Sequence, residues 1–366
     1  MCGLYIHIPF CVQKCKYCDF NSFSGLEGLF DDYFSCLDKE IERTKKNGDI
    51  FDTIYIGGGT PTAVDNFYLT GLIKSITNRT ENCEITVECN PGTAGFDDLI
   101  NLRRTGANRL SIGLQSTDND ELKMLGRIHT AEDFDECFQN ARRAGFDNIS
   151  IDVMFGLPGQ TVSKLEKTLY KASSYKSEHI SAYCLKVEEG TPFSKMKLNL
   201  PDDDTCAEMY ELCVSFLKKC GYNRYEISNF ARDGKISRHN TKYWTIDDYM
   251  GIGAGAHSLY KGKRFSKISN VKKYIETIDR GGSAVENEET LTEFDKMSQF
   301  VFLGLRLEEG ISLDRFNKIF GRSINSVFGE QINKYTKMNV MEIKDRRLFI
   351  KPEFLYVSNN ILSDFV

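Results

Sequence analysis

The sequence predicts an α/β protein, a partial (β/α)6 barrel followed by a smaller, mainly helical C-terminal domain. Short runs rich in β-branched and aromatic residues alternate with longer segments of helical periodicity from residue 4 to residue 185. Several helical segments end at a glycine, as at Gly106 and Gly145, which suits a helix C-cap. This rhythm changes after about residue 230, so a second type of structure is expected there.

The candidate strands and helices of the barrel follow one another in regular order. The strands are residues 4–8, 53–57, 84–88, 109–114, 148–155 and 179–185. The helices between them are residues 28–46, 65–78, 97–105, 131–144 and 162–175. Strands separated by helices pair in parallel through right-handed crossovers. In such barrels the active site lies at the carboxyl ends of the strands.

The chain divides into three predicted parts. Residues 1–230 form the barrel, and residues 231–289 connect it to a helical module at 290–366, with a short hairpin around 340–353. The connecting segment holds the string HNTKYW at 239–244 and the glycine-rich stretch YMGIGAGAHS at 249–258. Loops and turns are expected where glycine interrupts the apolar pattern.

The chain is expected to be cytoplasmic. It has ample material for a core, since 41% of its 366 residues are hydrophobic. A net charge of −5 without long single-sign blocks argues against a nucleic-acid partner. No uncharged apolar run approaches the ~18 residues that span a bilayer, so no transmembrane segment is expected. The N-terminus lacks a signal-peptide pattern, and the 12 cysteines are expected to be mostly reduced thiols.

Three cysteines, Cys11, Cys15 and Cys18, lie on the loop after the first predicted strand. A redox dithiol of Cys15 and Cys18 would leave Cys11 idle. A structural zinc site needs four ligands, and the loop offers no fourth cysteine or histidine nearby. Three thiolates on one loop suit a [4Fe-4S] cluster whose fourth iron stays open to another ligand.

The spacing Cys-x-x-x-Cys-x-x-Cys resembles the signature of radical S-adenosylmethionine (SAM) proteins. The string LYIHIPFCVQKCKYCDF at 4–20 is similar to the group that contains oxygen-independent coproporphyrinogen III oxidase and the HemW-type haem chaperones. This resemblance implies a radical-SAM barrel in which the unique iron binds SAM. It also implies reductive cleavage to a 5′-deoxyadenosyl radical, with a reductant such as flavodoxin or ferredoxin.

Residues at the ends of the predicted strands match the family's SAM contacts in chain order. The loop GGGTP at 57–61 lets backbone approach a ligand closely, although a lone glycine run is more often a turn. The resemblance implies SAM contacts at Tyr5, Gly58, Gly59, Thr60, Glu88, Gln115, Arg127 and Asp152. Arg127 would face the SAM carboxylate with its planar fork, and Glu88 would pair with ribose hydroxyls.

Two departures separate the chain from the oxidase. The oxidase motif resembles one with a further cysteine two positions after the third, where this chain has Phe20. The oxidase also carries an N-terminal extension that contacts substrate, whereas here the first cluster ligand is already Cys11. The parts expected to hold coproporphyrinogen are therefore absent.

The string HNTKYW matches the His-Asn-x-x-Tyr-Trp motif of HemW-type proteins. An imidazole is a good axial ligand for haem iron, so the match implies His239 in that role, with Tyr243 and Trp244 stacking on the macrocycle. The alternative interpretation is a structural His239 and a core anchor in Trp244, the only tryptophan.

Two functions follow as hypotheses, and whether the protein is an enzyme is left open. The first is a haem chaperone that carries cluster and SAM and delivers haem to acceptor proteins. The alternative is an oxidase that decarboxylates propionates of coproporphyrinogen III, and a third option is another radical-SAM reaction. Acceptors would include respiratory membrane proteins, with the chain cytoplasmic or peripheral to the membrane. A homodimer is left open.

Overall fold

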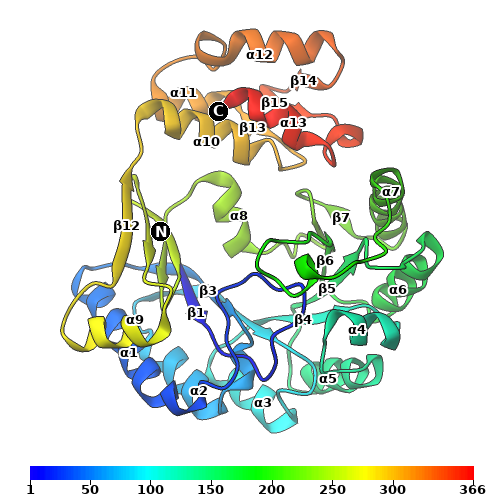
Figure 1. Ribbon diagram of the computed structural model, residues 1–366. Helices are drawn as coiled ribbons and strands as arrows, with labels where there is room; N and C mark the ends of the chain where they lie inside the picture. The colour runs from blue at the N-terminus through cyan, green and yellow to red at the C-terminus, as the bar shows by residue number, and fades with distance from the viewer.

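The computed structural model describes residues 1–366, and its centre is a curved parallel sheet (Figure 1). The strands of the barrel are β1 (Cys2–Ile8), β2 (Phe51–Gly58), β3 (Arg79–Cys89), β4 (Arg109–Gln115), β5 (Ile149–Phe155) and β6 (His179–Cys184). They lie side by side in chain order, and each neighbouring pair is parallel. The expected partial (β/α)6 barrel is confirmed, and its strand ends gather at one mouth.

Helices cover the outer face of this sheet, as Figure 1 shows. They are α1 (Phe30–Lys46), α2 (Asn66–Ser75), α3 (Phe96–Thr105), α4 (Asn119–Leu125), α5 (Ala131–Arg143), α6 (Val162–Ser174) and α7 (Asp203–Lys219). The main hydrophobic core lies between helices and strands, with Leu37, Ile41 and Leu165 fully buried in it. The predicted helices include neither α4 nor α7, and the seven residues of α4 are too few to show a helical period. The Asp118 side chain caps it, accepting from the Asp120 and Glu121 amides.

The sheet extends beyond the six barrel strands on both sides, through residues 223–231 next to β6 and through the middle segment next to β1. Beyond β6 lie β8 (Asn229–Ala231) and β7 (Asn223–Arg224). After α8 (Arg238–Thr245), β9 (Tyr249–Ile252) pairs in parallel with β1. The remaining elements are β10 (His257–Tyr260), β11 (Lys263–Lys267), α9 (Val271–Asp279) and β12 (Val285–Thr290). A Cβ at Gly251 would lie 2.3 Å from the His257 carbonyl oxygen, so glycine permits the close approach of β9 and β10.

The C-terminal module sits above the barrel in Figure 1 and has its own hydrophobic core. Its elements are α10 (Glu293–Gly304), β13 (Ile311–Ser312), α11 (Leu313–Phe320), α12 (Asn325–Lys337), β14 (Met341–Lys344), β15 (Arg347–Ile350) and α13 (Ser358–Leu362). The expected hairpin is the antiparallel pair of β14 and β15. The boundaries 1–230, 231–289 and 290–366 stay a prediction.

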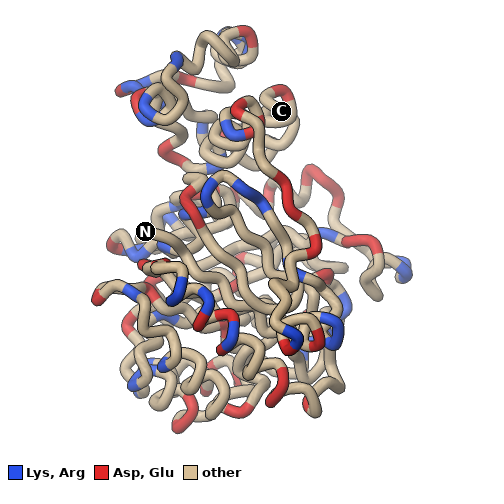
Figure 2. The backbone as a smooth tube through the Cα atoms, turned by 90° about the vertical axis from the view of Figure 1, so that its left-hand side faces the viewer, with Lys and Arg blue, Asp and Glu red and all other residues tan.

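Short 3-10 turns complete the chain, at Glu27–Leu29, Pro61–Ala63, Phe193–Lys195, Pro352–Phe354 and Ser363–Phe365. None of the helices combines the length and apolar character that crossing a bilayer requires. Figure 2 shows Lys and Arg interspersed with Asp and Glu along the chain on the side it presents.

Candidate functional site

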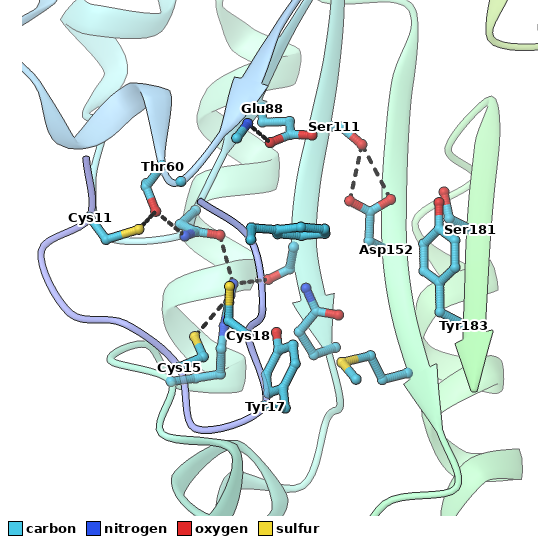
Figure 3. Close-up of a pocket in the computed structure, with 18 of the residues that line it drawn as sticks. Cys11, Cys15, Tyr17, Cys18, Thr60, Glu88, Ser111, Asp152, Ser181 and Tyr183 are labelled. Carbon is cyan, nitrogen blue, oxygen red and sulfur yellow. Dashed lines mark hydrogen bonds between the residues drawn. The ribbon is translucent and has the colours of Figure 1, made fainter. Parts of the chain in front are cut away.

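A cavity of about 390 Å³ opens at the carboxyl ends of the barrel strands (Figure 3). It brings together the three cysteines and most of the predicted SAM contacts. Those lining it are Cys11, Cys15, Cys18, Gly58, Gly59, Thr60, Glu88, Gln115, Arg127 and Asp152. Tyr5 and Tyr243 lie outside it, on a neighbouring cavity.

The three cysteine sulfurs each face a potential hydrogen-bond donor. The Thr60 hydroxyl donates to Cys11 Sγ at 3.6 Å, and Arg127 Nη1 donates to Cys15 Sγ at 3.6 Å. The Ser22 hydroxyl lies 3.7 Å from Cys18 Sγ. Burial raises the pKa of the Cys11 and Cys18 thiols. Donors aimed at sulfur are a feature of iron-sulfur sites, where they tune the cluster.

In this structure no three His, Cys, Asp or Glu side chains converge closely enough to hold a single metal ion. A cluster does not require the thiolates to converge on one point, because each thiolate binds a separate iron. The donor set of three soft sulfur ligands on one loop therefore fits a [4Fe-4S] cluster.

Gly59 fixes how closely the second strand's loop approaches the cysteine loop. Its amide donates to the Ile8 carbonyl at 2.8 Å. A Cβ there would lie 2.6 Å from the Phe10 carbonyl oxygen and 2.9 Å from Cys11 Sγ. A larger residue at this position would therefore disturb the cysteine loop as well as any ligand beside it.

Two carboxylates lie across the cavity from the cysteines, Glu88 near the end of β3 and Asp152 in the middle of β5 (Figure 3). Glu88 accepts from the Tyr55 hydroxyl at 2.8 Å and from the Gly58 amide at 3.1 Å. Burial raises its pKa to about 7, although those two bonds act in the opposite direction. Asp152 accepts from the Ser111 hydroxyl at 3.0 Å, and burial raises its pKa as well. Both carboxylates have acceptor capacity left for ligand hydroxyls.

Arg127 is held against the cysteine loop. Besides its bond to Cys15, its Nη2 atom donates to Asn90 Oδ1 at 2.7 Å and to the Gly113 carbonyl at 3.2 Å. Gln115 lies at the end of the same strand as Gly113, with a φ of 64°. The guanidinium is thus positioned by its neighbours before any ligand arrives.

Sequence reasoning missed several residues that shape this cavity, namely Tyr17, Tyr55, Asn90, Ser111, Ser181 and Tyr183. Some carried a usable signal, because Asn90 directly follows β3 and Ser111 lies two residues before Gly113 on β4. Period-two alternation along a strand would have placed Ser111 and Gly113 on one face.

The HNTKYW segment forms most of α8, and its histidine is fully buried. The Nδ1 atom of His239 lies 2.9 Å from the Thr53 hydroxyl, and Nε2 lies 3.0 Å from the Tyr243 hydroxyl. Burial, with the nearby positive charges of Lys242 and Arg109, lowers the pKa of His239 to about 3. Both ring nitrogens are therefore occupied by the protein, which is the geometry of a structural histidine.

Trp244 lies where α8 meets the C-terminal module. The Arg306 guanidinium sits 6.0 Å from the centroid of its ring, and its indole Nε1 is buried without a hydrogen-bond partner. The structure thus separates Trp244 from Tyr243, which lines a cavity inside the barrel. The assignment of all three residues to haem stays a prediction.

A parallel partial barrel with three cysteines spaced Cys-x-x-x-Cys-x-x-Cys at its mouth is the architecture of the radical SAM class. Residues 5–171 match the model of the Radical SAM superfamily, and residues 291–353 match that of the HemN C-terminal domain. Coproporphyrinogen III oxidase (HemN) from Escherichia coli superposes with a TM-score of 0.88 over 99% of this chain and 89% of its own. At 22% sequence identity, that likeness shows the shared fold.

Similarity to curated proteins identifies the family of this chain within the radical SAM class. The "Heme chaperone HemW" of Bacillus subtilis (strain 168) is 37% identical over 100% of this chain and 99% of its own. The protein of that name from Lactococcus lactis subsp. lactis (strain IL1403) is 33% identical over 99% of this chain and 96% of its own. The chain therefore belongs to the HemW family of radical SAM proteins.

Proposed function

We propose that this protein is a haem-binding chaperone that carries a [4Fe-4S] cluster and SAM and delivers haem to acceptor proteins. The observation that carries the proposal is the full-length identity of 37% to a protein named as a haem chaperone. The mouth of the barrel supports it, because Phe20 stands 64% exposed where the oxidase motif would have a further cysteine.

Cys11, Cys15 and Cys18 would hold the cluster, whose bound form supplies an open iron for SAM and an electron for its cleavage. This chain's own residues then shape the SAM site. Gly58 and Gly59 leave room for a ligand, and Arg127 offers a cation next to the cysteine loop. Glu88 and Asp152 offer acceptors for hydroxyl groups on the far side.

The chaperone and the oxidase are separated by a side-by-side assay on anaerobically reconstituted protein. We expect added haemin to bind with a shifted Soret band. We also expect no protoporphyrinogen IX from coproporphyrinogen III with SAM and a reductant. Turnover of the porphyrinogen without haem binding would show that the protein acts as the oxidase and not as the chaperone.

The SAM site can be tested without disturbing the cluster through Asp152→Asn. This change removes the charge of a buried acceptor, and a hydrogen bond to a charged group is worth roughly 1.5–3 kcal/mol. We expect SAM affinity, measured by calorimetry, to fall by roughly 10- to 150-fold, with iron content unchanged. Glu136→Gln, an exposed change on α5, is the matched control. Unchanged SAM affinity in Asp152→Asn would contradict the assignment of Asp152 to SAM.

The remaining partners belong to the same proposal. We propose respiratory membrane proteins as haem acceptors, a flavodoxin or ferredoxin as reductant, and a cytoplasmic location peripheral to the membrane. Sedimentation of the protein with and without haem would show whether it forms a homodimer.

A further inference from the structure

A second cavity, of about 500 Å³, adjoins the first inside the barrel. Phe20, Gly58 and Glu88 line both cavities, so the two share a wall at the barrel mouth. Tyr5 and His7 of β1 and Tyr249 of β9 also line the second cavity. Its volume lies within the range of small-molecule and cofactor sites.

Aromatic rings form much of the wall of this second cavity. Tyr5 comes from β1, Tyr243 from α8 and Tyr249 from β9, and Phe20 stands at the rim. Tyr243 and Tyr249 pack edge to face with their centroids 4.6 Å apart. Flat apolar ligands bind well against such rings.

The cavity also contains the one histidine of the chain whose ring is both exposed and without a hydrogen-bond partner, His257. His239 is occupied at both nitrogens, as is His7, which lies 2.8 Å from the Tyr5 hydroxyl and 2.8 Å from the Asn21 carbonyl. His179 is bonded at both nitrogens to Ser150 and Tyr225, and His129 is buried against the Leu114 carbonyl. Haem iron takes an imidazole nitrogen as axial ligand, and the ring of His257 has no other partner.

The backbone that carries His257 is held in place. The turn between β9 and β10 is anchored by Glu40, which accepts from the Gly253 amide at 3.0 Å, and by Tyr33, whose hydroxyl accepts from the Ala254 amide at 2.8 Å. Asn21 donates to the Ala254 carbonyl at 3.0 Å. A ligating side chain on such a fixed support needs little ordering when it binds.

We propose that haem binds in this second cavity with His257, not His239, as its axial ligand, and with Phe20 and Tyr243 against the macrocycle. This inference rests on the proposed function, because it assumes that the protein binds haem. The Lys14 ammonium donates to the Phe20 carbonyl at 2.8 Å and so places a positive charge beside Phe20 for a propionate. His239 then acts through Tyr243, whose hydroxyl it holds.

The test titrates haemin into the full-length protein and two histidine variants, followed by the Soret band and the electron paramagnetic resonance of ferric haem. We expect His257→Ala to weaken haem binding at least tenfold and to lose the imidazole signature, with free imidazole restoring the spectrum. His239→Gln, normalised to folded protein, should keep the wild-type haem spectrum.

A second variant keeps the test decisive if His239→Gln does not fold. In His257→Met a thioether would replace the imidazole, so the haem reduction potential should rise. An unchanged spectrum and potential in both His257 variants would overturn the inference while leaving the proposed function intact. Absence of haem binding in the wild-type protein would instead overturn the proposed function.

Discussion

Replacing Cys11, Cys15 or Cys18 by alanine is expected to abolish the bound [4Fe-4S] cluster. Each thiolate binds its own iron, so the loss of one leaves that iron without a protein ligand. The loop offers no other cysteine as a substitute. Of the other nine cysteines, only Cys89 and Cys184 line the same cavity, and they belong to the strands β3 and β6. Iron and sulfide analysis after anaerobic reconstitution, with the broad visible absorption of the cluster, measures the loss.

Buried cysteines elsewhere provide the matched controls. Cys36 on α1 and Cys213 on α7 are fully buried in the main core. Their change to alanine removes one sulfur from the core and costs on the order of 1 kcal/mol of stability. Iron content should stay at the wild-type value. A variant lacking all three loop cysteines that still bound about four irons per chain would disprove the cluster assignment.

The barrel could be predicted because its strands and helices carry strong local patterns. Ile54, Ile56, Ile149 and Ile151 belong to short apolar runs that the structure buries in β2 and β5. Helix α3 ends at Gly106, which has a φ of 121° that few other residues adopt. The positions of the cysteine loop and of Glu88 followed from the barrel, since parallel strands bring their carboxyl ends to one mouth. Asp152 followed from the resemblance to radical SAM proteins.

The widened sheet and the state of His239 could not be predicted in the same way. Strand β9 was not predicted, because Gly251 within it and Gly253 just after it contribute nothing to an apolar pattern. Glycine is nevertheless required there by the close packing of the strands. The motif around His239 shows an imidazole but not its partners. Thr53, which occupies one ring nitrogen, lies 186 residues away in the chain. Only the fold shows that this imidazole is engaged while His257 is exposed.

The junction between barrel and C-terminal module contains an acidic group that should make stability depend on pH. Glu226 lies between β7 and β8 and forms an isolated antiparallel bridge with Leu307, which follows α10. It is 0% exposed, and neither carboxylate oxygen has a hydrogen-bond partner. Burial raises its pKa from 4.5 to about 7, against the opposing effects of the Ser228 amide, Asn229 and the Arg306 charge.

The sign of the effect follows from the protons bound in each state. Between pH 4.5 and about 7 the folded protein keeps a proton on Glu226 that the unfolded chain has lost. The free energy of unfolding therefore falls as pH rises through this range. A pKa difference of this size corresponds to at most about 3 kcal/mol above pH 7.

We therefore expect Glu226→Gln to be more stable than the wild type at pH 8 by up to about 3 kcal/mol, because glutamine has no charge to bury. The difference should shrink as the pH falls to 4.5 and below, because the wild-type side chain becomes protonated in both states there. Urea unfolding of the apo protein across this range measures it. Glu330→Gln, an exposed change on α12, should stay within about 0.5 kcal/mol of the wild type throughout. A Glu226→Gln difference that does not grow from pH 5 to pH 8 would show that Glu226 remains ionised in the folded protein, with the Arg306 charge and the polar groups of Ser228 and Asn229 offsetting its burial.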